Sequence, residues 1–290
     1  MNFFKALFGG KEERPEEKER ADEAKRFDVL KYDGVRALRS GQADYAIKCF
    51  THALRINEDL EIRDYMSQAC IRADRLPEAY EHLLQIIKEQ PDNLQVYMRI
   101  AEVAYMMEDY TSMADACEKA MLIDGNNDKV TYLYAKACLG HGDAVNAVAM
   151  LTKAVSINPD NAEAYLLRGE TLLDGGDVTA ADDDVLRLLK DGDASEEALL
   201  LKARIEKAKG ENDVAIHYYD MVIDVNPFNI DAYRERGDVK TASGDVDGGK
   251  EDFAYADELA RDNDGNVAGS HEDVAKKIKD AYDSINPIGL

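Results

Sequence analysis

The stretch GDAVNAVAMLTKAVSINPDNAEAYLLRGETLLDGG, residues 142–176, decides the fold of this chain. Two apolar-periodic segments lie on either side of the tetrapeptide NPDN at 158–161. Proline ends a helix and disfavours helical geometry in the residue before it. Asp160 and Asn161 can accept hydrogen bonds from the N–H groups that open the next helix, and Gly175 and Gly176 supply the residue just past a helix end. The stretch therefore predicts a helix, a tight turn and a second helix.

This pattern recurs along the chain with a period of 33 or 34 residues. One column of mostly small residues contains Ala46, Ala79, Met113, Ala147, Ala181, Ala215 and Gly249, and a second column, twelve residues earlier, contains Gly34, Ser67, Ala101, Ala135, Gly169, Ala203 and Gly237. A third column, Ala53, Ile86, Ala120, Ala154, Leu188, Val222 and Ala256, follows the first by seven residues. Small residues at the contact allow two antiparallel helices to approach closely. Five of the seven turns within a repeat also carry glycine, at Gly41, Gly142, Gly176, Gly210 and Gly244.

A helix pair repeated every 34 residues resembles the tetratricopeptide repeat family, and the resemblance covers about 235 residues. It implies an all-α fold, a right-handed solenoid of about seven helix pairs whose first helices line a concave surface. We expect a charged N-terminal segment with a short apolar hook at 1–19, the repeat array at 20–263, and a loop, a capping helix and a tail at 264–290. The capping helix would cover the open apolar end of the solenoid.

The composition limits the classes of partner and the cellular compartment that we expect. The formal net charge of −23 argues against binding to nucleic acid or to anionic lipid surfaces. No apolar run approaches the ~20 residues of a membrane span, so membrane contact is expected only through residues 1–10. With no recognisable secretory signal, the cytoplasm is the expected compartment. The cysteines, Cys49, Cys70, Cys117 and Cys138, are expected to be free and buried in helices.

Acidic residues are abundant on the predicted helices. We expect most of them to lie on solvated outer faces. The run Asp182-Asp183-Asp184 is expected to open the second helix of the fifth repeat, where carboxylates complement the helix dipole.

Tetratricopeptide arrays bind extended or helical peptide segments on the concave surface, and the resemblance places particular residues there. The candidate partner-binding residues are Ile71, Met98, Glu102, Tyr105, Tyr132, Lys136, Leu139, Leu166, Glu170, Leu173, Leu200 and Arg204. They form two apolar rows on either side of a charged row. The alternative is that the apolar rows pack against neighbouring first helices and only half face the groove. Lys31 matches one member of the family's carboxylate clamp, but Val35 and Gln68 replace the expected asparagines, which argues against such a clamp.

The sequence therefore predicts a non-catalytic scaffold that binds a protein or peptide partner. No constellation of residues indicates a catalytic site, a metal site or a cofactor site. The alternative function is an accessory or regulatory subunit of a membrane-associated or larger assembly, anchored by the N-terminal hook. The oligomeric state and the identity of the partner do not follow from the sequence.

Overall fold

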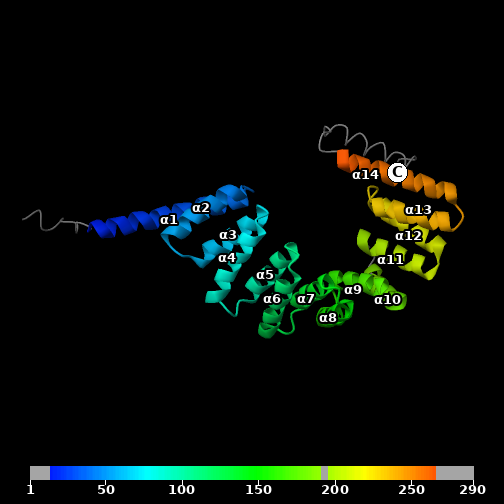
Figure 1. Ribbon diagram of the computed structural model, residues 1–290, viewed down its shortest axis with the longest axis horizontal. Helices are drawn as coiled ribbons and strands as arrows, with labels where there is room; N and C mark the ends of the chain where they lie inside the picture. Colours follow the sequence, from blue (N-terminus) through cyan, green and yellow to red (C-terminus); the bar gives the residue numbers. More distant parts are fainter. Residues whose placement is uncertain (1–13, 191–194, 266–290) are drawn as a thin grey trace, which may run out of the picture. The chain divides into compact units, whose positions relative to one another are not determined.

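The computed structural model describes residues 14–190 and 195–265, with side chains up to residue 261. These residues form helices and contain no strand. The predicted N-terminal hook and the predicted capping helix lie outside the described residues. Figure 1 shows the helices following one another as pairs joined by short turns.

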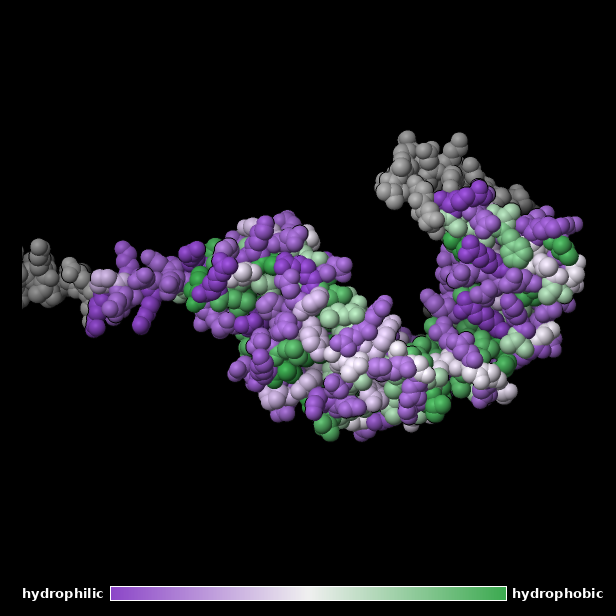
Figure 2. All heavy atoms as spheres, in the orientation of Figure 1, coloured by the Kyte–Doolittle hydropathy of each residue, from purple (hydrophilic) through white to green (hydrophobic). Residues whose placement is uncertain are grey.

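The chain divides into two compact units, Met1–Met150 and Leu151–Leu290. The helices of the first unit are α1 (Pro15–Arg39), α2 (Ala43–Ile56), α3 (Leu60–Arg72), α4 (Leu76–Glu89), α5 (Leu94–Met106), α6 (Tyr110–Ile123) and α7 (Asp128–Gly140), and α8 (Ala144–Ile157) spans the boundary. The helices of the second unit are α9 (Ala162–Asp174), α10 (Val178–Leu189), α11 (Glu196–Lys209), α12 (Asn212–Val225), α13 (Ile230–Ala242) and α14 (Val246–Gly265). The first helix begins at Pro15, and its first turns are exposed and hydrophilic (Figure 2).

Small residues set the distance between the helices of a pair. All seven residues of the first column and all seven of the second are buried. A Cβ added at Gly34 would lie 2.5 Å from Phe50 Cε1, so the aromatic ring occupies the space that a larger residue would need. Some first helices also contact the first helix of the next repeat: α1 contacts α3, α5 contacts α7, and α9 contacts α11. Each unit therefore has a layer formed by its first helices.

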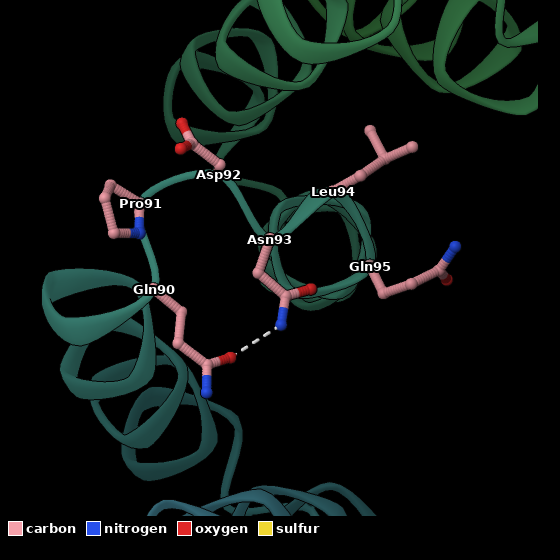
Figure 3. Close-up of a pocket in the computed structure, with 6 residues that line it drawn as sticks. All are labelled: Gln90, Pro91, Asp92, Asn93, Leu94 and Gln95. Carbon is pink, nitrogen blue, oxygen red and sulfur yellow. Dashed lines mark hydrogen bonds between the residues drawn. The ribbon is translucent and has the colours of Figure 1, made fainter.

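Side-chain caps begin the first helices at one column of the repeat. From the second repeat onward, the residue before each first helix accepts a hydrogen bond from the backbone N–H three residues later. These capping residues are Asp59, Asn93, Asn127, Asn161, Ser195 and Asn229. Figure 3 shows one such turn, in which Asn93 also donates a 2.7 Å hydrogen bond from Nδ2 to Gln90 Oε1. The caps satisfy N–H groups that have no partner inside the helix.

The expectation for the Asp182-Asp183-Asp184 run is wrong. The helix begins at Val178, and Asp177 is its cap, so the run lies a full turn inside α10. Asp184 is buried and pairs with Arg168, while Asp182 accepts hydrogen bonds from Lys202 and Lys209. These two carboxylates therefore join α10 to neighbouring helices instead of complementing a helix end.

Candidate functional site

The candidate partner-binding residues of the first unit lie on α3, α5 and α7. Tyr105 retains 40% of its surface and is the most open apolar member of the set. The Lys136 ammonium lies 3.6 Å from the centroid of the Tyr105 ring and 5.8 Å from that of Tyr132. A cation at this distance is attracted to the ring face. The first helices α5 and α7 thus present an exposed aromatic ring with a lysine held against it.

The other apolar candidates are more enclosed. Met98 is buried at 9% exposure and belongs to the core of the first unit. Ile71 and Leu139 are half-buried, and Ile71 packs against the same core. Glu102 is exposed. Packing within the first unit therefore covers part of the surface of Ile71 and Leu139 and nearly all of the surface of Met98.

In the second unit, Leu166, Leu173 and Leu200 are half-buried and pack against the local cores. Glu170 lies one turn from Leu166 and Leu173 on the same face of α9 and is also half-buried. Burial raises the pKa of the Glu170 carboxyl, the nearby Arg204 opposes this, and Asp174 and Glu197 add to the rise.

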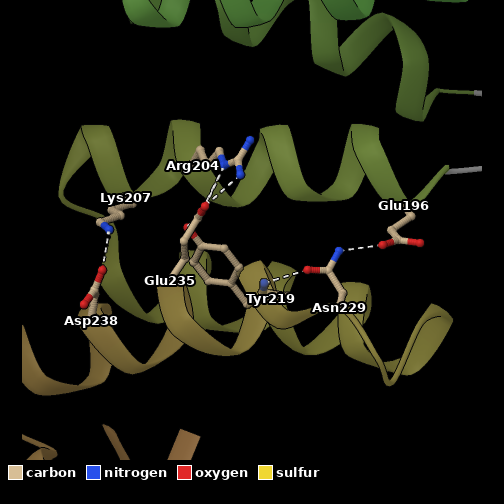
Figure 4. A network of polar contacts seen from close by, with 8 residues as sticks. Glu196, Arg204, Lys207, Tyr219, Asn229, Glu235 and Asp238 are labelled. Carbon is tan, nitrogen blue, oxygen red and sulfur yellow. Dashed lines mark hydrogen bonds and ion pairs between the residues drawn. The ribbon is translucent and has the colours of Figure 1, made fainter. Parts of the chain in front are cut away.

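Arg204 is engaged with a residue that the sequence reasoning did not single out. Its guanidinium donates to both carboxylate oxygens of Glu235 on α13, at 2.7 to 3.1 Å. The fully buried Tyr219 donates its hydroxyl to the same carboxylate at 2.9 Å (Figure 4). A spacing of 16 residues joins an arginine on a first helix to an aspartate on the second helix of the same repeat in Arg168–Asp184 and Arg236–Asp252, so this spacing was a usable sequence signal for these two pairs.

The basic residues that could form a carboxylate clamp are paired within the chain. Lys31 donates a 2.6 Å hydrogen bond to Glu61 and lies 3.7 Å from Asp59. Arg99 pairs with Asp64 and donates to Ser67 Oγ at 2.5 Å. A carboxylate ligand would have to displace these partners, which agrees with the absence of the clamp asparagines.

The described residues contain no group of three or more His, Cys, Asp or Glu side chains arranged to hold a metal ion. None of the described helices combines the length and the apolar character needed to cross a bilayer. The four cysteines are free and buried.

Comparisons with known proteins agree with this architecture. A sequence model of the tetratricopeptide repeat matches residues 139–205, and no curated protein sequence matches the chain. A tetratricopeptide repeat protein from Parabacteroides merdae is similar in structure with a TM-score of 0.68 at 13% identity, over 89% of this chain and 98% of that one. PilF of Pseudomonas aeruginosa gives a TM-score of 0.56 at 16% identity, over 71% and 94% of the two chains.

A third similar structure is YrrB, described as a tetratricopeptide repeat protein with an unusual peptide-binding site. Its TM-score is 0.52 at 17% identity, over 62% of this chain and 93% of that one. At these identities the likeness establishes the fold, an all-α solenoid of helix pairs.

Proposed function

Because this chain is built of tetratricopeptide repeats, we propose that it is a non-catalytic scaffold that binds segments of partner proteins. Repeats of this family are generally non-catalytic and generally bind protein or peptide partners. In each unit the binding surface would be the layer of first helices, here called the first-helix surface of that unit, and the twelve candidate residues named above are divided between the two layers. The likeness to YrrB, a repeat protein with a peptide-binding site of its own, supports this class of function.

The observation that carries the proposal is the pair formed by Tyr105 and Lys136. Binding energy in protein interfaces concentrates in a few large anchors, and tyrosine is common among them. Tyr105 is 40% exposed, and the contact with Lys136 holds its ring in place before a partner arrives. An anchor that is already ordered loses less entropy on binding.

Peptides selected from a random displayed library on the full chain test this proposal. Tyr105→Ala should weaken the selected peptides that use the first unit by roughly tenfold or more, since truncating an anchor costs about 2 kcal/mol. The matched control is Tyr45→Ala on α2, because Tyr45 is 49% exposed but lies on a second helix. Lys136→Glu should also weaken the binding of these peptides. Circular dichroism melting establishes that each variant folds.

The proposal fails if every selected peptide binds the first-helix variants Tyr105→Ala, Lys136→Glu and Leu166→Ser as tightly as the parent. Loss of binding in Tyr45→Ala instead would assign the interaction to the second helices.

The alternative, an accessory subunit anchored by residues 1–10, stays a prediction because these residues lie outside the described part of the chain. Deleting residues 1–13 separates the two functions. A scaffold that acts through its first helices keeps its peptides, whereas an anchored subunit loses its location. The cytoplasmic location also stays a prediction.

A further inference from the structure

The first-helix surface of the second unit has two parts with different electrostatics. Between α11 and α13, polar side chains are joined to one another. Glu196 accepts a hydrogen bond from Asn226 at 2.9 Å. Figure 4 shows the other contacts, in which Asn229 donates to Glu196 at 2.5 Å, Arg204 pairs with Glu235, and Lys207 lies 3.6 Å from Asp238. These contacts satisfy the polar groups of this part within the chain.

The basic groups of this surface are all engaged. Besides Arg204 and Lys207, Arg234 on α13 lies 3.5 Å from Asp257. A partner carboxylate would therefore compete with an existing intramolecular partner at each cation. The surface is a poor receptor for acidic peptides.

Between α9 and α11, acidic side chains lack such partners within the described part of the chain. Glu163, Glu170 and Glu197 form no hydrogen bond or ion pair with any residue that the structure describes. Glu163 precedes Leu166 by three residues, and Glu170 follows it by four. Residues at these spacings are neighbours on a helix surface, so both glutamates lie beside Leu166 on one face of α9. Glu197 is close enough to Glu170 to raise its pKa. The carboxylates therefore form one group across two adjacent first helices.

This acidic group surrounds apolar surface. A cavity of about 380 Å³ lies between the N-terminal ends of α9 and α11, and Glu163, Leu166, Leu188, Glu197 and Ala198 are among its lining residues. Glu170 itself is half-buried beside Leu166 and Leu173. Glu170 makes no hydrogen bond to any described side chain or backbone group, and the nearby Arg204, which attracts its carboxylate, is already bound to Glu235. The carboxylate lacks part of its hydration, so a second cation placed there gains more than it would in open water.

We propose that the strip formed by Glu163, Leu166, Glu170 and Leu173 on α9 with Glu197 and Leu200 on α11 binds a partner segment whose lysine or arginine side chains alternate with apolar ones. This rests on the proposed scaffold function and adds the chemistry of the partner and its place on the array. The basic side chains pair with the carboxylates, and the apolar ones lie on the leucines and in the cavity. In the α11–α13 part, Glu196, Glu235 and Asp238 already have partners within the chain.

Two synthetic probes test this on the full chain. The cationic probe is a labelled twelve-residue peptide in which lysine and arginine alternate with leucine, and the neutral probe has glutamine in place of every basic residue. Glu170→Gln with Glu197→Gln should weaken the cationic probe by about tenfold, in line with the loss of a charged hydrogen bond. The same variant should leave the neutral probe unchanged, and glutamine keeps the shape of the side chains.

The matched control is Glu251→Gln with Glu258→Gln on α14, which removes the same net charge from exposed positions. It should change the affinity of either probe by less than about twofold, since exposed charges at a distance are screened. Equal weakening by the two variants would show attraction to net charge alone and overturn the proposal. No effect of the Glu170/Glu197 variant, or no binding of the cationic probe at millimolar concentration, would also overturn it.

Failure here is distinct from failure of the scaffold function. If library peptides depend on Tyr105 or Leu166 but not on Glu170 and Glu197, the scaffold function stands and the basic-segment strip is wrong. If no peptide depends on any first-helix residue, the scaffold function itself is wrong.

Discussion

Seven residues of the described chain have positive φ, one in each turn between the two helices of a repeat. Five are the predicted glycines, with φ between 74° and 98°, and the other two are Asp74 at 56° and Glu108 at 57°. The left-handed conformation strains residues that have a Cβ, and aspartate tolerates it better than glutamate. Glu108 is therefore the most strained of the seven turn positions.

Substitutions at two of these turns should change stability in opposite directions. Gly142→Ala should lower the free energy of unfolding by about 1 kcal/mol, because φ is 74° at this position. The added Cβ would have no atom within 4 Å, so the loss would come from the backbone conformation and not from a clash. Glu108→Gly should raise it by about 0.5 kcal/mol, since relief of strain exceeds the entropy that glycine adds to the unfolded chain. Urea denaturation measures both changes.

Gly175→Ala is the matched control, because φ at Gly175 is −76° and the added Cβ would make ordinary contacts at 3.4 and 3.5 Å. It should change stability by less than about 0.5 kcal/mol. A loss in Gly175→Ala equal to that in Gly142→Ala would refute the explanation from backbone strain.

The cysteines give a second prediction at this scale. Burial raises the pKa of the Cys70 thiol to about 11 and that of Cys117 to about 12. At pH 8 only about one Cys70 thiol in a thousand is then the reactive thiolate. We expect both to react with a bulky thiol reagent only after denaturant is added. Complete labelling of both within the mixing time under native conditions would contradict this.

At the scale of the elements, buried ion pairs join the helices of the second unit. Arg236 on α13 donates to both oxygens of Asp252 on α14, at 2.9 and 2.5 Å, and to Asp220 at 2.6 Å. The side chain of Asp252 is only 6% exposed and also lies 3.0 Å from Lys240. These contacts fasten the last pair of described helices.

Asp252→Ala should lower the free energy of unfolding by about 3 kcal/mol, because it leaves a largely enclosed guanidinium without this partner. Lys250→Ala on the same helix is the control, since the Lys250–Asp247 pair is exposed and such pairs contribute less than about 1 kcal/mol. Chemical denaturation of both variants gives the comparison. Equal small losses would show that the Arg236–Asp252 pair is not a structural tie.

A neighbouring network predicts a pH dependence. Burial alone would raise the pKa of Asp182 and of Glu206, but hydrogen bonds from Lys202 and Lys209 outweigh it and hold both pKa values below their usual range. A carboxyl whose pKa is lowered by folding stabilises the folded state above its unfolded pKa of about 4. That contribution is lost as the pH falls through the lower folded value.

Lys202→Met should therefore cost about 3 kcal/mol of stability at pH 7, since it leaves enclosed carboxylates with one lysine fewer. The difference from the parent should shrink as the pH falls below about 4, because the unfolded chain then takes up protons and the parent loses the contribution of its lowered carboxyl pKa values. Denaturation at pH 7 and pH 3 measures it, with the exposed Lys153→Met as the control. A difference that stays constant between these pH values would assign the loss to packing.

At the scale of the whole molecule, we expect the net charge of −23 to affect the rate at which charged partners associate. A long-range negative potential speeds the encounter with cationic partners, and salt screens it. Raising the salt concentration from about 0.05 M to about 0.5 M should lower the association rate constant of the cationic probe by roughly tenfold or more. The dissociation rate constant should change much less.

Stopped-flow fluorescence separates the two rate constants. The neutral probe provides the control, because its association should hardly depend on salt. A salt effect confined to dissociation would show that the overall charge does not steer binding.

The helix pairs and their order follow from local features of the amino-acid sequence. A period of 34 residues, columns of small residues and turn residues such as Gly142 and Asn161 act locally or between adjacent helices. Their effects therefore follow from spacing along the chain. The buried columns, the asparagine caps and the five glycines with positive φ confirm these predictions.

The pairing of the charged residues, in contrast, depends on how the helices pack in three dimensions. Nothing in the spacing alone shows that Arg204 is engaged by Glu235, or that the side chain of Asp184 is buried. Met98 likewise follows the groove pattern but is buried. A side chain on a first helix can pack against a neighbouring helix, form an ion pair with it or face solvent. Small shifts of one helix relative to another determine which of these occurs. Periodicity determines the face of a helix, whereas the partners on that face depend on three-dimensional distance.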